Sequence, residues 1–298
     1  MNAQADVIAE PDDFGSGKTH RDENFPVASF VIHPRHRDII LAFYRFARAA
    51  DDVADHERAS PDEKLRHLDI MRQTLLGESD AARDALALRV LLRARGLGTD
   101  HAEDLLEAFR RDVTKTRYEN FGELMDYCRF SAMPVGRFVL DVHGESRSLW
   151  PACDALCAAL QILNHLQDCA QDYRTLDRVY IPLDEFSRAG IAPAALAEPR
   201  ASPALLGILR GMTGKTQTLL RQSAPFARGI RSSRLAFEVS VIQTLAENLL
   251  QRLLRKDPLS QNVHHGKIDA LALIVPAFRR FAHARFSAAR TRRNAERD

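Results

Sequence analysis

The sequence predicts an all-α fold: a single domain whose helices form a bundle around a central cavity. Three observations support this prediction. Alanine, leucine and arginine dominate the 298 residues, whereas β-branched clusters and period-two alternation are scarce. Signals that start and stop helices recur along the chain. No internal repeat or clear linker divides it, and its hydrophobic (45%) and charged (28%) fractions are ordinary for a soluble globular protein.

Capping residues set the expected boundaries of the helices. The start signals are Pro34, the capping box Ser60–Glu63 with proline at N1, and the N-caps Ser79, Asp100 and Asn120. The stop signals are Gly77, Gly96 and Gly144. Helices are expected at 34–57, 61–76, 80–95, 101–116, 121–143, 152–173, 203–226, 232–256 and 266–287, with loops at 144–151, 174–202 and 257–265. Residues 1–20 are expected to be a disordered tail, residues 21–287 the domain, and residues 288–298 a basic tail.

Composition excludes several classes of function. The net charge of +2, without a dense Lys/Arg block, gives no reason to expect nucleic acid as a partner. The four cysteines lack CxxC spacing, and the N-terminus has no apolar signal-peptide region. No apolar run approaches the length of a membrane span. We expect a cytoplasmic protein. Its basic C-terminal stretch is either simply solvated or able to touch acidic lipid at the inner membrane.

Two aspartate pairs are the main candidates for chemistry. Asp51/Asp55 and Asp168/Asp172 each place two carboxylates at i and i+4 on one helix face, where like charges repel. Chance would give on the order of five acidic pairs at this spacing on solvated helix faces, so spacing alone is weak. Carboxylates from two facing helices would form an oxygen-rich Mg²⁺ site that a substrate phosphate completes.

The neighbours of each pair favour a functional stripe. Tyr44 and Arg48 precede Asp51 on the same helix face, among mostly apolar or alanine residues. Asn164 stands four residues before Asp168. A solvated face would normally carry mixed lysine and glutamate instead. Asp52 points about 100° away from Asp51, which predicts a supporting rather than a ligating side chain.

Other motifs do not support a function. The GSGKT at 15–19 lacks the glycine that a Walker A motif needs at position 12, where the chain has Asp12, and no strand precedes it. No HExxH is present, and no GxGxxG opens a helix. His165, beside the second pair, is expected to be a cavity or packing residue.

Three segments in this order resemble the squalene/phytoene synthase family: YRFARAADDVAD (44–55), YCRFSAMPVGRFVLDVHG (127–144) and NHLQDCAQDYRTLDRVYIP (164–182). The resemblance covers roughly residues 20–285. It implies the isoprenoid-synthase type of helical bundle. Within the family, ENFPVAS (23–29), YCRFSAMPVGR (127–137) and the Gln-Asp of HLQD (165–168) resemble the branch of bacterial hopanoid synthesis.

The resemblance implies roles for individual residues. The residues expected to hold two or three Mg²⁺ ions, bridged to the substrate diphosphate, are Asp51, Asp55, Asn164, Asp168 and Asp172. The residues expected to bind substrate are Asn24, Phe25, Tyr44, Arg48, Gln167, Arg178 and Tyr180. Tyr127 would lie near the reacting carbons and, with Arg48, Asp51 and Asp168, belong to the catalytic set.

Two departures from the family pattern bear on the substrate. Relatives that condense two prenyl diphosphates usually carry arginine just before the first aspartate of the second motif, where this chain has Gln167. The missing charge favours an enzyme that handles one diphosphate per turnover. In addition, Ala132-Met133-Pro134-Val135-Gly136 replaces a glycine-rich stretch, so Pro134 either shapes the cavity wall or only kinks the helix.

The implied activity is conversion of presqualene diphosphate to hydroxysqualene by loss of diphosphate, cation rearrangement and water capture. No NADPH is expected, because no nucleotide-binding motif is visible and capture by water is therefore favoured over transfer of a hydride. The alternatives are a squalene- or phytoene-type synthase that condenses two prenyl diphosphates such as farnesyl diphosphate, and a non-catalytic isoprenoid-binding homologue. Partner enzymes of squalene synthesis are possible partners under each of these hypotheses.

Overall fold

The computed structural model describes residues 33–295, and within this range it contains helices and no strand. The α-helices are α1 (Pro34–Asp55), α2 (Pro61–Leu76), α3 (Arg83–Arg95), α4 (Asp100–Thr114), α5 (Phe121–Ser131), α6 (Met133–Val142), α7 (Trp150–Leu176), α8 (Leu183–Arg188), α9 (Pro203–Ser223), α10 (Phe226–Gly229), α11 (Ser233–Arg255), α12 (Lys267–Ala272) and α13 (Ile274–Ala295). Two short 3₁₀ helices, η2 (Arg147–Leu149) and η3 (Pro193–Ala197), lie in connections. None of the described helices is long and apolar enough to cross a membrane.

Several of the expected capping residues are confirmed. Ser60 and Glu63 form a complete capping box at the start of α2, and Asn120 accepts from the backbone N–H of Glu123 at the start of α5. Two others are wrong. Helix α3 begins after Ala82, because Ser79 bonds within the preceding turn, to Ala81. Helix α4 has Thr99 rather than Asp100 at its N-cap.

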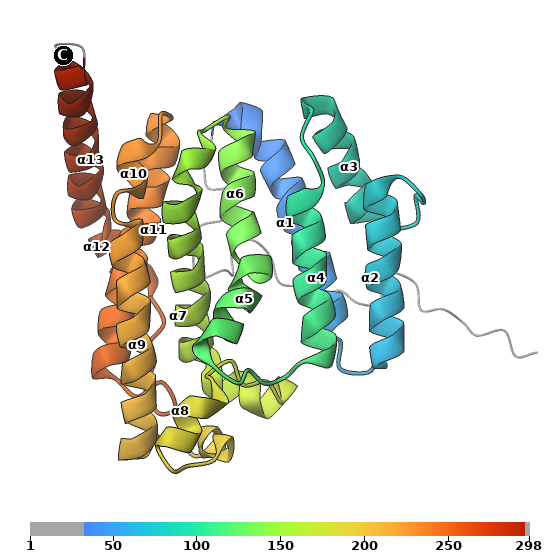
Figure 1. Cartoon of the computed structure of the whole chain (residues 1–298), viewed down its shortest axis with the longest axis vertical. Coiled ribbons are helices and arrows are strands. Elements are labelled where there is room, and N and C mark those ends of the chain that lie inside the picture. Colours follow the sequence, from blue (N-terminus) through green and yellow to red (C-terminus); the bar gives the residue numbers. More distant parts are fainter. Residues whose placement is uncertain (1–32, 296–298) are drawn as a thin grey trace, which may run out of the picture.

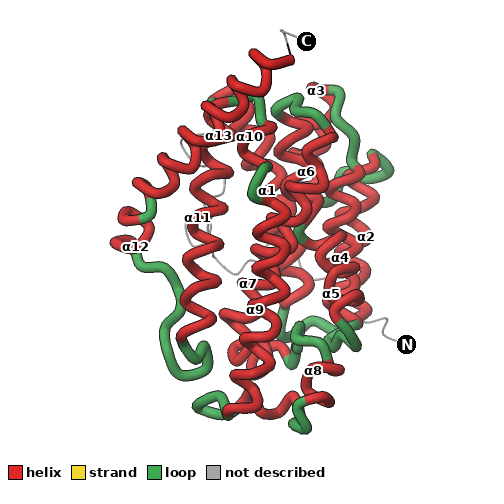
Figure 2. The backbone as a smooth tube through the Cα atoms, turned by 60° about the vertical axis from the view of Figure 1, so that its left-hand side comes forward, coloured by secondary structure: helices red, strands yellow, loops and turns green. Residues whose placement is uncertain are grey.

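The long helices lie side by side in two groups (Figure 1). Helices α1–α4 share one cluster of buried side chains, and α5, α7, α9 and α11 contribute to a second, larger one. Helix α6 joins the groups, since Phe138 stacks on Phe43 of α1 with ring centroids 3.9 Å apart. The tube view shows α13 running along the edge of the bundle and past its end (Figure 2).

Several expected elements differ from the structure. The helix expected at 203–226 ends at Ser223 and is followed by the separate α10, and the loop expected at 144–151 contains η2 and the first residues of α7. The single helix expected at 121–143 breaks at Ala132, whose φ of −123° and ψ of −46° separate α5 from α6. Pro134 then lies in the first turn of α6, so the proline marks a helix break. The expected loop 174–202 contains α8 and η3, and the expected helix 266–287 is interrupted at Leu273 and continues to Ala295.

One irregular connection positions part of the site. Helix α7 ends at Leu176 and is followed by Asp177, which caps it in a left-handed conformation with φ of 48°. The chain then runs beside the segment that links α4 to α5. The backbone N–H of Val179 donates to Thr116 O at 2.9 Å, and that of Leu183 donates to Tyr118 O at 2.8 Å. These bonds fix the backbone on both sides of Tyr180.

Candidate active site

The first aspartate pair lies on the last two turns of α1. Arg48 lies one turn before it and donates to Asp51 at 2.8 Å and to Asp52 at 2.5 Å. The side chain of Asp52 is only 9% exposed, which agrees with its expected supporting position, whereas Asp51 and Asp55 are 35% and 34% exposed. Tyr44 lies a further turn back and is half-buried. The stripe expected from the sequence therefore forms, with its two outer carboxylates open to a ligand.

The second pair lies near the end of α7. Asp168 and Asp172 are both partly exposed, and Asn164 is half-buried one turn before them. Gln167 is buried, and its amide lies 3.4 Å from Asp168 Oδ1. His264, from the α11–α12 connection, approaches the same oxygen at 3.5 Å.

Electrostatics show that the two pairs share one environment. Burial, and then repulsion from Asp55, raise the pKa of Asp51 to about 7 against the attraction of Arg48. Burial, and then repulsion from Asp168, raise the pKa of Asp172 to about 7, and Asp55 on the other helix contributes to that shift. Added positive charge between α1 and α7 would relieve this repulsion.

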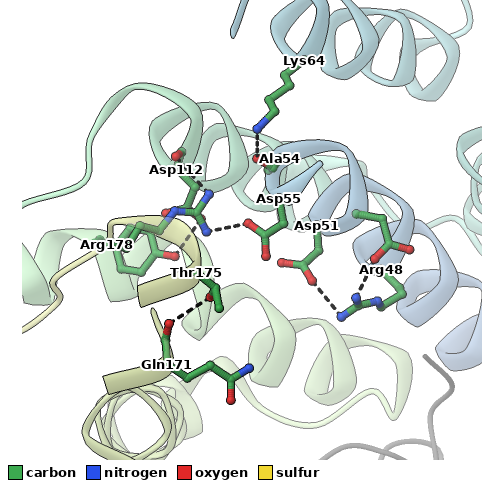
Figure 3. Close-up of polar contacts among 11 residues, drawn as sticks. Arg48, Asp51, Ala54, Asp55, Lys64, Asp112, Gln171, Thr175 and Arg178 are labelled. Atoms are coloured by element: carbon green, nitrogen blue, oxygen red, sulfur yellow. Dashed lines mark hydrogen bonds and ion pairs between the residues drawn. The ribbon is translucent and has the colours of Figure 1, made fainter. Parts of the chain in front are cut away.

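Arg178 connects the helices that carry the aspartates (Figure 3). Its Nη1 donates to Asp55 Oδ1 at 2.5 Å, and its Nη2 donates to the main-chain oxygen of Asp112 at 3.1 Å. Its backbone N–H donates to Asp172 O at 3.2 Å. The side chain is 8% exposed. Arg178 therefore contacts α1, α4 and α7 from within the protein, beneath the carboxylate of Asp55.

A buried carboxylate lies under the aspartates. Asp112 of α4 accepts a hydrogen bond at Oδ2 from the hydroxyl of Tyr127, with 2.8 Å between the oxygens, while its Oδ1 has no hydrogen-bond partner among the described residues. Burial raises the pKa of Asp112 to about 7, although Arg178 and Tyr127 act to lower it. Burial and Asp112 raise the pKa of Tyr127 well above its usual value, so its hydroxyl stays protonated.

Aromatic rings enclose this polar pair. The Tyr180 ring lies 5.5 Å from that of Tyr127 and 5.7 Å from that of Tyr118, and His165 stacks on Tyr180 with centroids 3.4 Å apart. Burial lowers the pKa of His165 to about 3, so the ring is neutral. His165 thus packs within this aromatic layer, which is one of the two placements expected from the sequence, and the layer surrounds the Asp112–Tyr127 pair.

The side chains that could bind metal ions are divided between α1 and α7. Within residues 33–295, no three His, Cys, Asp or Glu side chains come close enough to hold one ion together. Each aspartate pair offers oxygen ligands alone, the donor type that Mg²⁺ prefers, and a hard cation commonly completes its shell with substrate phosphate. The residues therefore fit Mg²⁺, which Asp51 and Asp55 on one helix and Asp168 and Asp172 on the other would hold together with oxygens from a bound phosphate group.

Comparison with known proteins identifies the family. The model of the squalene/phytoene synthase family matches residues 18–269. The chain belongs to the squalene/phytoene synthase family. It is 57% identical to the hydroxysqualene synthase of Rhodopseudomonas palustris, over 85% of this chain and 87% of that one. It is 54% identical to the hydroxysqualene synthase of Zymomonas mobilis, over 87% and 88%. The solved squalene synthase HpnC from Alicyclobacillus acidocaldarius superposes with a TM-score of 0.69 at 29% identity, covering 80% of this chain and 90% of that one.

These matches confirm three expectations, namely the family, an all-α fold of its helical type, and an enzyme rather than a binding module. The roles of individual residues remain predictions. The structure pairs Arg48 with Asp51 on α1, pairs Arg178 with Asp55, and brings Asp55 and Arg178 close enough to Asp172 of α7 to shift its pKa. Asn24 and Phe25, with the GSGKT segment and the tail 1–20, lie outside the described residues.

Sequence reasoning missed Asp112, although a signal for it exists. In α4 the buried positions Ala102, Leu105, Leu106 and Asp112 fall at helical spacing, with Phe109 packed between them. A carboxylate on an otherwise apolar stripe needs a partner when it is buried. That pattern singles out Asp112 as a residue with a role.

Proposed function

We propose that this member of the squalene/phytoene synthase family converts presqualene diphosphate to hydroxysqualene in a Mg²⁺-dependent reaction. One observation carries the proposal. Two pairs of partly exposed aspartates, on α1 and α7, share one electrostatic environment, and Arg178 links Asp55 to the buried Asp112, whose carboxylate accepts a hydrogen bond from Tyr127. Relatives that are 54% and 57% identical are named hydroxysqualene synthases, which supports the choice of product.

Loss of diphosphate is the first step. The bond between the substrate carbon and the diphosphate oxygen breaks, and its electron pair leaves with the diphosphate. Bound Mg²⁺ supplies positive charge that stabilises the oxygens as they become negative. Arg48, on the half-exposed face of α1, can turn from Asp51 to the diphosphate and add a donor. Arg178 stays beneath Asp55 and keeps that carboxylate in place.

Rearrangement and capture of the cation come next. The carbocation has to avoid water until it has rearranged, and the rings of Tyr118, Tyr127 and Tyr180 form an apolar layer beside the site. One water molecule then bonds to the cation and gives up a proton. Tyr127 takes this proton as it passes its own to Asp112 Oδ2, which lies 2.8 Å away. A base with a pKa near 7 suits this task.

A condensing synthase is the second candidate function. It is favoured by the likeness to the solved squalene synthase HpnC, at 29% identity over 80% of the chain. Gln167 argues against it, because a buried, neutral amide stands beside Asp168 where a second diphosphate would need positive charge. Water capture also requires no reductant, so no NADPH is included in the proposal.

A product assay separates the two candidates. The protein is incubated with Mg²⁺ and without NADPH, and is given presqualene diphosphate or farnesyl diphosphate in separate reactions. Hydroxysqualene from presqualene diphosphate alone is the expected result. A condensation product from farnesyl diphosphate would favour the second candidate, and absence of any product from a folded protein would favour the isoprenoid-binding homologue.

A further inference from the structure

The outer face of the C-terminal helices carries an apolar stripe. Leu271 at the end of α12 and Val275, Phe278 and Phe286 of α13 have exposed fractions of 65%, 59%, 58% and 78%. Val275, Phe278 and Phe286 follow one another at intervals of three and eight residues, which places them along one side of α13, and Leu271 precedes them on α12. We call these four residues the outer stripe. Phenylalanine in particular rarely remains this exposed, so a row of such side chains marks an interaction surface.

The opposite side of α13 accounts for its packing within the protein. Ala277 and Ala284 are buried, and Phe281 meets Phe237 of α11 edge to face with centroids 5.6 Å apart. Both overall views show α13 at the margin of the bundle, beside α10 and α11 and extending past them (Figures 1 and 2). The outer stripe is therefore not needed to attach α13 to the bundle.

The segment that carries the outer stripe is strongly basic, although Asp269 lies two residues before Leu271 and pairs with Arg252. Residues 270–295 contain six arginines and no aspartate or glutamate. A cleft of about 730 Å³ lies between α10, α11 and α13, and its lining includes Arg228, Arg279, Arg280 and His283. The one acidic side chain in this lining, Glu247, is paired with Arg280. Basic side chains that border exposed apolar ones form the pattern of a helix lying in a membrane interface.

We propose that α12 and α13 dock on the surface of an anionic lipid bilayer. The outer stripe enters the boundary between headgroups and acyl chains, and the exposed Arg228 and Arg279 meet the lipid phosphates. A second copy of this chain fits the surface less well. A two-fold dimer brings the same patch of both subunits together, which would oppose arginine to arginine. This inference goes beyond the proposed function and does not depend on it, because membrane binding needs no substrate.

Co-sedimentation with vesicles tests the inference on the full chain. One set of vesicles is phosphatidylcholine alone, and the other is phosphatidylcholine mixed with phosphatidylglycerol. The wild-type protein should bind the mixed vesicles and release them as salt rises. The double variant Phe278→Ser/Phe286→Ser should bind at least about tenfold more weakly, since the interfacial burial of two phenylalanines is lost.

The chain offers a matched control. Val275 of the outer stripe and Val90 of α3 are 59% and 57% exposed, so the same substitution can be compared at two sites. Val275→Ser should weaken binding to the mixed vesicles, whereas Val90→Ser should not. Circular dichroism checks that each variant keeps its helices.

Three results would overturn the inference. The first is a wild-type protein that binds neither vesicle, and the second is equal binding by the wild type and the double variant. The third is a wild-type dimer that becomes monomeric in the double variant without any binding to vesicles, which would make the outer stripe an interface between two copies of the chain.

Discussion

Replacing Asp112 with asparagine tests whether this buried carboxylate accepts a proton during turnover. The substitution keeps the size of the side chain and an oxygen that can accept the 2.8 Å hydrogen bond from Tyr127. It removes the basicity, because an amide does not take up a proton near neutral pH. A positioned general base contributes about 10²–10⁴-fold to a rate. We therefore expect kcat to fall by at least about 10²-fold while KM changes little.

The dependence of kcat on pH distinguishes a proton acceptor from a structural residue. Asp112 has to be ionised to accept a proton, and its pKa is about 7. In the wild-type protein kcat should therefore rise as the pH increases through this value. The Asp112→Asn variant should lose this rise. Tyr127→Phe should resemble it, and the double variant should be hardly slower than either single one, since the two residues act as a unit.

The Asp112→Asn substitution should also change how the stability of the folded protein depends on pH. The pKa of Asp112 is about 7 in the folded protein and 3.8 ordinarily. Between these values the folded chain holds a proton that the unfolded chain has released, so the wild-type protein loses stability as the pH rises through this window. The difference corresponds to at most about 4 kcal/mol. The Tm of Asp112→Asn relative to wild type should therefore increase from about pH 5 to about pH 8.

The control is Asp69→Asn, because Asp69 is an exposed residue of α2 that pairs with Arg110 at 2.5 Å. It should leave kcat and its pH dependence unchanged. The reasoning is refuted if Asp112→Asn keeps the helicity, the kcat and the acid limb of the wild type. In that case the proton released by the water goes elsewhere, and the bond to Tyr127 is only structural.

Three further predictions concern metal, substrate and core. Asp51→Asn and Asp168→Asn should each reduce Mg²⁺-dependent turnover by about 10²-fold or more with helicity intact, and near wild-type rates in both would show that the metal assignment is wrong. Gln167→Arg should allow the enzyme to accept a second prenyl diphosphate. If product analysis shows an unchanged range of substrates, Gln167 no longer supports a reaction on one diphosphate per turnover. Phe138→Ala removes a buried ring that stacks on Phe43, and chemical denaturation should show a loss of about 3–5 kcal/mol, whereas a loss below about 1 kcal/mol would contradict this packing.

Helix periodicity and capping residues, which are local features of the sequence, made the fold and the polar stripe on α1 predictable. The stripe Arg48, Asp51 and Asp55 depends only on the period of one helix, which the sequence displays directly. The capping box at Ser60 is equally local. The break at Ala132 was not predicted, because periodicity continues through it and a proline two residues later is compatible with either a kink or a new helix.

Contacts between distant segments were not predictable in this way. Arg178 reaches Asp55 across 123 residues, and the oxygen of Asp112 across 66. These contacts depend on the pairing of the connection after α7 with the segment between α4 and α5. Sequence spacing carries no information on such pairing. The family resemblance indicated Arg178 as a substrate-binding residue, and only the structure shows that it lies beneath Asp55.

The position of Arg178 explains how two separately packed groups of helices can hold one substrate group. Asp55 belongs to the cluster of α1–α4, whereas Asp172 lies on α7 in the other group. Arg178 bonds to both helices, through its side chain to Asp55 and through its backbone to Asp172. Its guanidinium can make two directed bonds at once, which a lysine cannot reproduce. The spacing of the two aspartate pairs is therefore fixed before substrate arrives, so less binding energy is needed to organise the site.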